Sequence, residues 1–349
     1  MDPIALLEQL SNIVGPSGSE DDVRDLLIDT VKPLVDEVVT DRVGNVICTR
    51  RGKRDDVLLL DAHMDEVGFL VAYIEDTGFL RLSPLGGWDA RVLPAHALTI
   101  RGRDGERIRG VIGTLPPHIT ADTDRKKAFT LPDLFLDIGA ASRDEAAAMG
   151  VDVGCPVVPG YPFERMGDDL VMGKAFDDRA GCTVAVAVLD ALQGADLDLT
   201  LAVTFTTSEE VGLRGARTVA DQVQPAVAIA LEGTTAVDVP GVTGAKKLAS
   251  MGKVPAITIA DSSLIASRQV TAKIQELGDA RQIPYQMKLP GGGGTNAAAF
   301  QPSGRGALAG VIAVPVRYIH APLSLLRPSD LDAAVRLTTA FAHDAASLL

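Results

Sequence analysis

Two adjacent glutamates, Glu209 and Glu210, follow an apolar run in the stretch VTFTTSEEVGLRGA. Carboxylates at the end of a buried strand lose their hydration, so they need a cation or a hydrogen-bond donor close by. Other groups that bind metals or protons also follow apolar runs: His63 comes after VLLLDA, Glu232 after AVAIAL, and His320 after VIAVPVRYI. These residues are the first candidates for a reactive site.

A further carboxylate, Asp177, begins a predicted helix after the segment MGKAF and faces the same side. In open α/β sheets, ligands bind outside the carboxyl ends of the strands, so these side chains are expected to converge. Two histidines together with three carboxylates suit zinc, cobalt or manganese. If one carboxylate is shared, each of two ions receives three protein contacts, and such ions lie roughly 3.5–4 Å apart. The residues therefore predict two bound divalent metal ions.

The adjacent glutamates can divide two tasks. A carboxylate that binds a cation is a poor base, because the cation holds its lone pairs. The base must therefore be another carboxylate that is close by and not coordinated. One glutamate of the pair is expected to bind a metal while its neighbour takes a proton from an attacking water, which predicts a hydrolase.

The elements that position these residues indicate an α/β fold. Apolar runs alternate with amphipathic segments before residue 67 and after residue 166, which predicts a mixed, largely parallel sheet flanked by helices. The segment EVVTDRVGNVICTR predicts a hairpin that turns at Gly44–Asn45. In PSGSEDD, Ser19 and Asp22 predict a capping box at the start of a helix.

The middle of the chain differs from its flanks. Between residues 68 and 165, short runs such as FLVAYI, ALTIRG and RIRGVIG are separated by Gly, Pro and Asp. This pattern predicts a small β-rich domain, comprising residues 68–165, inserted into an α/β catalytic domain that comprises residues 1–67 and 166–349.

Composition excludes several classes of protein. The 349 residues carry a formal net charge of −13, which argues against nucleic-acid binding because phosphate contacts need clustered Lys and Arg. No uninterrupted apolar run of about 18 residues occurs, so no membrane span is expected. The three cysteines, Cys48, Cys155 and Cys182, are odd in number and far apart, which predicts no disulfide framework. The segment MDPIALLEQLSNIVG does not read as a signal peptide, so a cytoplasmic protein is expected.

Several blocks resemble a known family when they are taken in order. LLLDAHMDEVGF, GKAFDDRAG, TSEEVGLRGA, ALEGTTAVDVPG, IPYQ and VPVRYIHAP are similar to blocks of the M42 metallo-aminopeptidases, which include glutamyl aminopeptidases and TET-type peptidases. DLFLDIGAASRDEAAAMGVDVG resembles the segment that ends the inserted domain of that family. The resemblance runs nearly from end to end, and the order and spacing of the blocks make it specific.

The resemblance implies a role for each candidate residue. One metal would be held by His63, Asp177 and Glu232. The other would be held by Asp177, Glu210 and His320, with Asp177 shared. Glu209 would be the general base, and Asp65, two residues after His63, would orient its imidazole. This sequence differs from the family pattern at GGTN, where Asn296 stands in place of the usual Asp. No role is assigned to Asn296.

The implied activity is removal of the N-terminal residue from peptides that carry a free N-terminus. The resemblance also implies that the inserted domain dimerises and that dimers assemble into dodecamers. One alternative is a glycosidase that is metal-dependent or uses paired carboxylates, since members of the family have been labelled cellulases. Another is a non-catalytic peptide-binding shell. The sequence leaves open the preferred N-terminal residue and the choice among zinc, cobalt and manganese.

Overall fold

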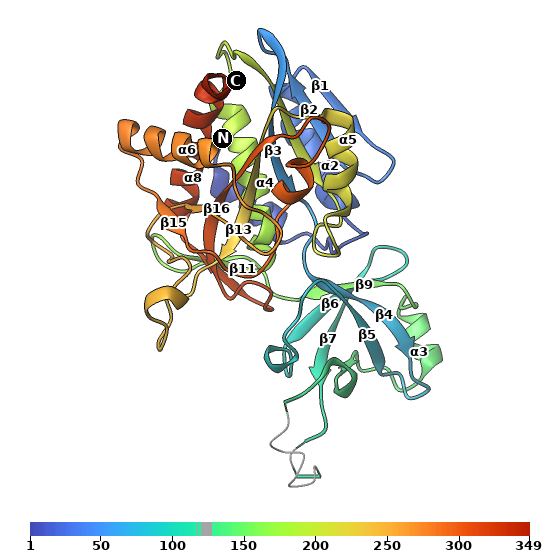
Figure 1. The fold of residues 1–349 in the computed structure, drawn as a ribbon. Helices are drawn as coiled ribbons and strands as arrows, with labels where there is room; N and C mark the ends of the chain where they lie inside the picture. The colour runs from blue at the N-terminus through green and yellow to red at the C-terminus, as the bar shows by residue number, and fades with distance from the viewer. Residues whose placement is uncertain (117, 120–127) are drawn as a thin grey trace.

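The computed structural model describes residues 1–116, 118–119 and 128–349, which form a large α/β part and a smaller β-barrel (Figure 1). The centre of the large part is a block of four parallel strands. Their order in the sheet is β12 (Leu199–Thr206), β3 (Arg54–His63), β13 (Val227–Thr235) and β16 (Leu308–Arg317). Helices cover both faces of this block, which explains why its strands read as nearly continuous apolar runs.

The edges of the large sheet are antiparallel, so the sheet is mixed. One edge is the hairpin of β1 (Glu37–Thr40) and β2 (Val46–Arg50). The other edge consists of β17 (Ser324–Leu326), β11 (Val171–Gly173) and β10 (Glu164–Arg165). A branch is formed by β14 (Ala256–Thr258), which pairs with β16 and runs parallel to β15 (Gln286–Lys288).

The alternation of side chains in β3 distributes the core over two faces of the sheet. Leu58 and Leu60 join the main core, and Leu59 joins a smaller core on the opposite face. The main core is built by α1 (Pro3–Ser11), α2 (Asp21–Val31), α4 (Phe176–Ala191), α6 (Arg268–Arg281) and α8 (Pro328–Asp344). The smaller core is built by α5 (Arg214–Val223) and α7 (Ala297–Phe300). Because α4 contacts β3, β13 and α8, nearly all of its faces are buried.

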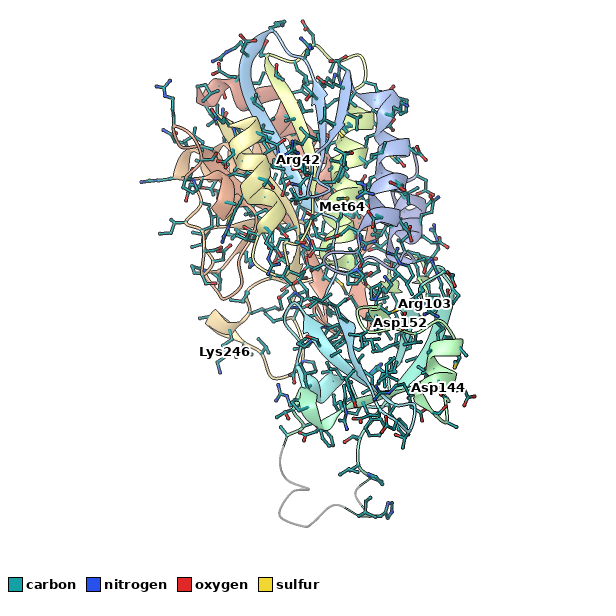
Figure 2. The ribbon with its side chains drawn as sticks, turned by 90° about the vertical axis from the view of Figure 1, so that its right-hand side faces the viewer. Arg42, Met64, Arg103, Asp144, Asp152 and Lys246 are labelled. Atoms are coloured by element: carbon teal, nitrogen blue, oxygen red, sulfur yellow. The ribbon has the colours of Figure 1, made fainter. Side chains whose placement is uncertain are left out.

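The barrel is a closed antiparallel sheet with a core of its own. Its strand order is β4 (Gly68–Ile74), β5 (Leu80–Leu85), β8 (Phe135–Asp137), β7 (Arg107–Gly113), β6 (Ala97–Arg101) and β9 (Pro156–Pro159). Pairing of β4 with β9 closes it. Closure leaves no free edge along the strands. Helix α3 (Arg143–Ala148), which carries Asp144, and an ion pair between Arg103 and Asp152 lie on its surface (Figure 2).

Short 3₁₀ helices complete the secondary structure at Lys32–Leu34, Ala90–Val92, Leu131–Asp133, Gly244–Lys246 and Ala345–Leu348. The predicted α/β fold with an added small β-rich part is confirmed. Glu164–Arg165, which ends the range predicted for the insertion, pairs with β11 in the large sheet. Within the described ranges, no helix is long and apolar enough to cross a membrane.

The predicted capping box at Ser19 is wrong. Helix α2 begins at Asp21, and Glu20 occupies its N-cap position without a side-chain bond to the helix. The Glu20 carboxylate instead accepts hydrogen bonds from the N–H groups of Gly18 and Ser208. A contact with a segment 188 residues away therefore overrides the local capping pattern.

Candidate active site

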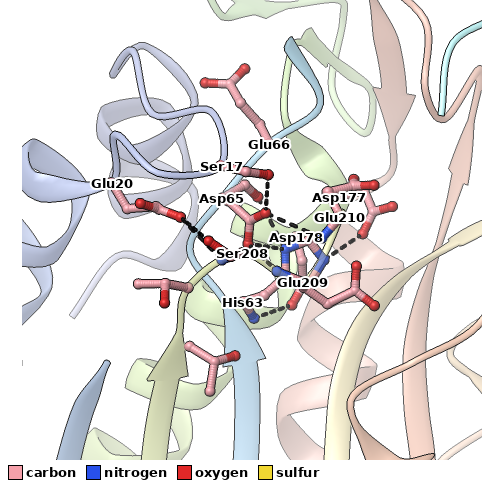
Figure 3. A network of polar contacts seen from close by, with 12 residues as sticks. Ser17, Glu20, His63, Asp65, Glu66, Asp177, Asp178, Ser208, Glu209 and Glu210 are labelled. Carbon is pink, nitrogen blue, oxygen red and sulfur yellow. Dashed lines mark hydrogen bonds and ion pairs between the residues drawn. The ribbon is translucent and has the colours of Figure 1, made fainter. Parts of the chain in front are cut away.

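The carboxyl ends of the parallel strands bring the candidate residues to one place. Figure 3 shows four of them together: His63, Asp177, Glu209 and Glu210. His63 is the last residue of β3, and Glu232 lies in β13. Glu210 follows β12, and His320 follows β16. Asp177 lies in the first turn of α4, which begins beside these strand ends. The structure thus brings together five side chains that the sequence analysis selected.

The five side chains form two groups that share Asp177. In the first group, His63, Asp177 and Glu232 each offer a ligand atom within 4.8 Å of the others, and Asp177, Glu210 and His320 do the same in the second. Asp177 Oδ1 lies 3.3 Å from His63 Nε2, while its Oδ2 lies 3.4 Å from His320 Nε2. Each oxygen of one carboxylate therefore faces a different histidine, which is the arrangement that a bridging ligand requires.

Burial of so many carboxylates strongly perturbs their protonation. Burial raises the pKa of Glu209 to about 8 and also raises the pKa of Glu210 and of Glu232. Burial alone would lower the pKa of His320, but hydrogen bonds to Asp177 and Glu210 outweigh it and raise that pKa to about 11. The cluster holds more carboxylates than imidazoles, and its mixed nitrogen and oxygen donors fit two divalent cations.

Asp65 holds three segments of the site together. His63 Nδ1 lies 3.0 Å from the Asp65 carbonyl oxygen and 3.4 Å from its Oδ1. The same carboxylate accepts hydrogen bonds from the N–H groups of Glu209, at 3.0 Å, and Glu210, at 3.2 Å. Ser17 Oγ donates a further hydrogen bond to it at 2.6 Å. Asp65 therefore contacts the imidazole, as expected, and also the turn that carries both glutamates.

Two contacts near this turn were missed by the sequence analysis. Glu20 accepts the N–H of Ser208 at 3.0 Å, beside the φ of +55° that Ser208 adopts. Asp178 accepts the backbone N–H of His63 at 3.1 Å and that of Gly181 at 2.9 Å. The contacts of Glu20 with Ser208 and of Asp178 with His63 have no local signal in the sequence, since they join segments that are 188 and 115 residues apart.

A cavity of about 620 Å³ opens over the two groups. His63, Glu209, Glu210 and His320 line it. Its lining also includes Thr258 and Lys288 from the strand branch, the loop of residues 292–295, and the apolar residues Val311 and Ala313 of β16. Glu209 belongs to neither group of candidate ligands, yet its side chain faces the same space.

The order of these residues along the chain matches one family of enzymes over most of its length. A family model described as M42 glutamyl aminopeptidase matches residues 44–337. The chain belongs to the M42 family. FrvX of Escherichia coli K12 is 34% identical over 338 residues, which cover 97% of this chain and 94% of FrvX. A lysyl aminopeptidase of Pyrococcus furiosus is 31% identical over 342 residues, covering 97% of this chain and 96% of the relative. M42 membership makes the chain a metal-dependent hydrolase of the aminopeptidase class.

Solved structures agree with the M42 assignment. Aminopeptidase APDkam598 of Desulfurococcus kamchatkensis is 38% identical, with a TM-score of 0.94 over 98% of this chain and 94% of the other. The TET1 peptidase of Pyrococcus horikoshii, described as assembling into a tetrahedron or a large octahedral shell, has a TM-score of 0.87 and 31% identity over 98% of this chain and 100% of the other. A structure described as an endoglucanase of Thermotoga maritima has a TM-score of 0.79 and 32% identity over 98% of both chains.

Asn296 is the residue at which this chain differs from the usual M42 pattern. It lies close to the site and is fully buried. Its Nδ2 donates to Asp61 Oδ2 and to Thr206 Oγ1, both at 2.8 Å. Asp61 is two residues before His63 in β3, and Thr206 ends β12 ahead of the two glutamates. Burial raises the pKa of Asp61 to about 6, although hydrogen bonds from Thr204 and Asn296 oppose this shift. Asn296 thus ties a loop of the cavity wall to both strands.

Proposed function

We propose that this M42 enzyme is a two-metal aminopeptidase that removes the N-terminal residue from peptides, with Glu209 as its general base. The observation that carries the proposal is the position of Asp177 between His63 and His320, with one carboxylate oxygen toward each imidazole. Glu209 stands in the same cavity outside both ligand groups, so neither cation would hold its lone pairs.

The five residues that would hold the two cations are His63, Asp177, Glu210, Glu232 and His320. Zinc or cobalt suits this donor set best, and manganese is a further option. When bound, the cations would polarise the scissile carbonyl and make the attacking water more acidic. Glu209 would take the proton of that water and pass it to the leaving amine. The buried carboxylates would attract the cationic α-amino group, which restricts cleavage to chain ends.

The proposed role of Glu209 predicts the behaviour of a conservative variant. Glu209→Gln removes the proton acceptor but keeps the shape of the side chain and the backbone hydrogen bond to Asp65. We expect turnover to fall by roughly 10²–10⁴, the usual contribution of a general base, with metal content unchanged. Both enzymes would be stripped with a chelator and reloaded with zinc, cobalt or manganese. A panel of aminoacyl-p-nitroanilides would then be assayed, and near-normal turnover by the variant would remove Glu209 from this role.

The glycosidase alternative has some support, since one similar structure is described as an endoglucanase. Paired carboxylates alone hydrolyse glycosides, and such a site has no use for two histidines beside them. A glycosidase of that kind would cleave carboxymethylcellulose and keep this activity after chelation. Peptidase activity that disappears on chelation, without cellulose cleavage, is the expected result. A metal-loaded protein that cleaves none of the anilides would favour the non-catalytic peptide-binding shell.

The proposed enzyme also assembles with copies of itself. We propose that the barrel part mediates dimerisation and that dimers build a dodecamer, as the similar TET1 peptidase is described as forming a dodecamer or a shell. Light scattering after size-exclusion chromatography would then give twelve times the 36.5 kDa of one chain. A mass of two chains would limit the proposal to the dimer.

A further inference from the structure

Three charged side chains are buried outside the lining of the cavity: Glu66, Lys174 and Arg179. Glu66 is 1% exposed, Lys174 is 3% exposed, and Arg179 is fully buried. Lys174 Nζ lies 2.6 Å from Glu66 Oε1, and Arg179 Nη2 lies 3.5 Å from the same oxygen. Charged side chains are almost never buried completely unless they are paired. We call these three residues the Glu66 cluster, and the proposed mechanism gives none of them a task.

The Glu66 cluster has one carboxylate for two cations. Burial lowers the pKa of Lys174 to about 8, so its ammonium group still carries a charge at pH 7. The second positive charge lies against the end of α1, whose last turn contains no basic residue. Arg179 Nη1 donates to the carbonyl of Leu10 at 2.6 Å, and Lys174 Nζ donates to that of Ile13 at 2.6 Å. Carbonyls at the C-terminal end of a helix carry a partial negative charge, so the two cations fit there.

The Glu66 cluster also holds the chain on both sides of a contact at the site. The N–H of Gly15 donates to Glu66 Oε1 at 3.2 Å, and the N–H of Glu66 donates to the carbonyl of Gly15 at 3.1 Å. Gly15 is two residues before Ser17, whose hydroxyl group donates to Asp65 at 2.6 Å. Figure 3 shows the Glu66 side chain directed away from the residues around Asp65. The cluster therefore fixes the chain just before Ser17 and directly after Asp65.

Stability alone does not explain a buried cluster of this kind. Removing three charges from water often costs more than their mutual attraction returns, and well-packed apolar residues of similar volume are often as stabilising. Hydrogen bonds from charged donors are directional and stronger than neutral ones, so they hold backbone segments in defined positions. Such positioning matters for Asp65, because its carboxylate accepts the N–H groups of Glu209 and Glu210 at 3.0 and 3.2 Å.

We propose that Lys174 is a positioning residue that acts on the proposed base through the contact between Ser17 and Asp65. Its ammonium group draws together the chain before Ser17 and the residue after Asp65. The Asp65 carboxylate is thereby held against the turn that carries Glu209. The effect on catalysis rests on the proposed aminopeptidase function, whereas the effect on the turn does not.

A double-mutant cycle tests the path through Ser17 in the metal-loaded enzyme. Lys174→Met removes the ammonium group and leaves Glu66 paired with Arg179, so no uncompensated charge stays buried. We expect Lys174→Met and Ser17→Ala each to lower kcat by about 3- to 30-fold for the p-nitroanilide that the wild type cleaves fastest, with KM and metal content near the wild type. If both act through Asp65, the double variant stays within about threefold of the less active single variant, whereas independent effects multiply.

Lys273→Met is the matched control for the loss of a paired ammonium group. Lys273 lies on α6 and pairs with Glu276 and Asp344, at 3.0 and 3.1 Å. Its side chain is 16% exposed, so it also loses a partly shielded ion pair. The control should keep the wild-type kcat and KM.

Hydrogen exchange measures the position of the turn without requiring turnover. In the metal-loaded protein, Lys174→Met should make exchange faster at the N–H groups of Glu209 and Glu210, which donate to Asp65. Lys273→Met should leave exchange at both groups unchanged. A change confined to the end of α1, with unchanged exchange at the two glutamates, would show a purely structural role and overturn the proposal.

The remaining outcomes separate this proposal from the function on which its catalytic part rests. Losses of kcat that multiply in the double variant would overturn it, and so would a wild-type kcat or a loss of metal in Lys174→Met. If Lys174→Met does not fold, Ser11→Ala takes its place, because Ser11 Oγ donates to the Lys174 carbonyl at 2.8 Å; faster exchange at the same two amides is expected. If the wild type cleaves no anilide, the aminopeptidase function fails, and hydrogen exchange alone decides whether Lys174 positions the turn.

Discussion

At the scale of single residues, Asp177 determines how the site is organised. One carboxylate lies between two imidazoles, one at the end of β3 and one in the segment after β16, and each of its oxygens faces one ring. If the proposed assignment is right, each histidine serves a different ion. The two positions can therefore be tested separately by removing one ring at a time.

The metal content of single-histidine variants checks this assignment. We expect His63→Ala and His320→Ala each to lose at least one of two bound ions and to lower activity by more than tenfold, because each ion loses its only nitrogen ligand. His343→Ala, which removes an exposed ring on α8, is the control and should keep both ions. Elemental analysis after desalting measures the result. Wild-type metal content in either site variant would contradict the ligand assignment.

The protonation of His320 predicts how metal binding depends on pH. Hydrogen bonds to Asp177 and Glu210 overcome the effect of burial and raise its pKa to about 11, so the metal-free protein carries this proton at pH 7. A cation needs the neutral ring and must displace the proton. Metal affinity should therefore fall as the pH decreases, by about tenfold per unit for each displaced proton. Titration calorimetry in two buffers of different ionisation enthalpy measures proton release, and identical heats in both buffers would exclude it.

How far the sequence predicts the site depends on whether a residue's role is local. The candidates at strand ends could be found because they follow apolar runs, and Asp177 because it begins a predicted helix on the same side. Parallel strands bring their carboxyl ends together. Glu20 and Asn296 could not be assigned in this way. Glu20 follows a sequence that resembles a helix cap, and its partner Ser208 is 188 residues away. Asn296 is in a glycine-rich loop, and its partner Asp61 is 235 residues away.

At the scale of elements, the turn after β12 is held from outside by the N-terminal loop. Ser17 donates to Asp65 at 2.6 Å, and Asp65 accepts the N–H groups of Glu209 and Glu210. Glu20 accepts the N–H of Ser208 in the same turn. The segment that connects α1 to α2 thus contacts the turn that carries the proposed base, as Figure 3 shows.

This bracing predicts an effect on turnover without loss of metal. Ser17→Ala removes one buried hydrogen bond to Asp65, which is worth about 1.5–3 kcal/mol when the acceptor is charged. We expect kcat to fall by about 3- to 30-fold because Glu209 is held less firmly, while metal content and KM stay close to the wild type. Ser19→Ala, in the same loop, is the matched control, since Ser19 makes no side-chain hydrogen bond within the described residues. A loss of metal in Ser17→Ala would show that the loop supports the ligands instead.

At the scale of the whole molecule, the barrel and the α/β part have separate hydrophobic cores. Leu98, Leu136 and Val157 are fully buried in the barrel core, whereas the main core lies between the large sheet and its helices. The α/β architecture was predictable because the hydrophobic pattern changes at residue 68. Closure of the barrel was not predictable from the sequence, because it depends on pairing between the distant strands β4 and β9. All candidate ligands lie in the α/β part.

Removal of metal should consequently destabilise the molecule unevenly. Without cations, the ligand set in the α/β part loses the stabilisation that comes from binding, and ligand binding stabilises a native state by about 2.7 kcal/mol at a hundredfold excess over Kd. We expect chelation to lower the free energy of unfolding of the α/β part by about that amount. Hydrogen exchange should become faster in β3, β12 and α4 and stay unchanged in the barrel strands. His320→Ala, which already lacks one ion, should respond less to chelator. Equal loss of protection in both parts would mean that the barrel depends on the metal site for its stability, which its separate core argues against.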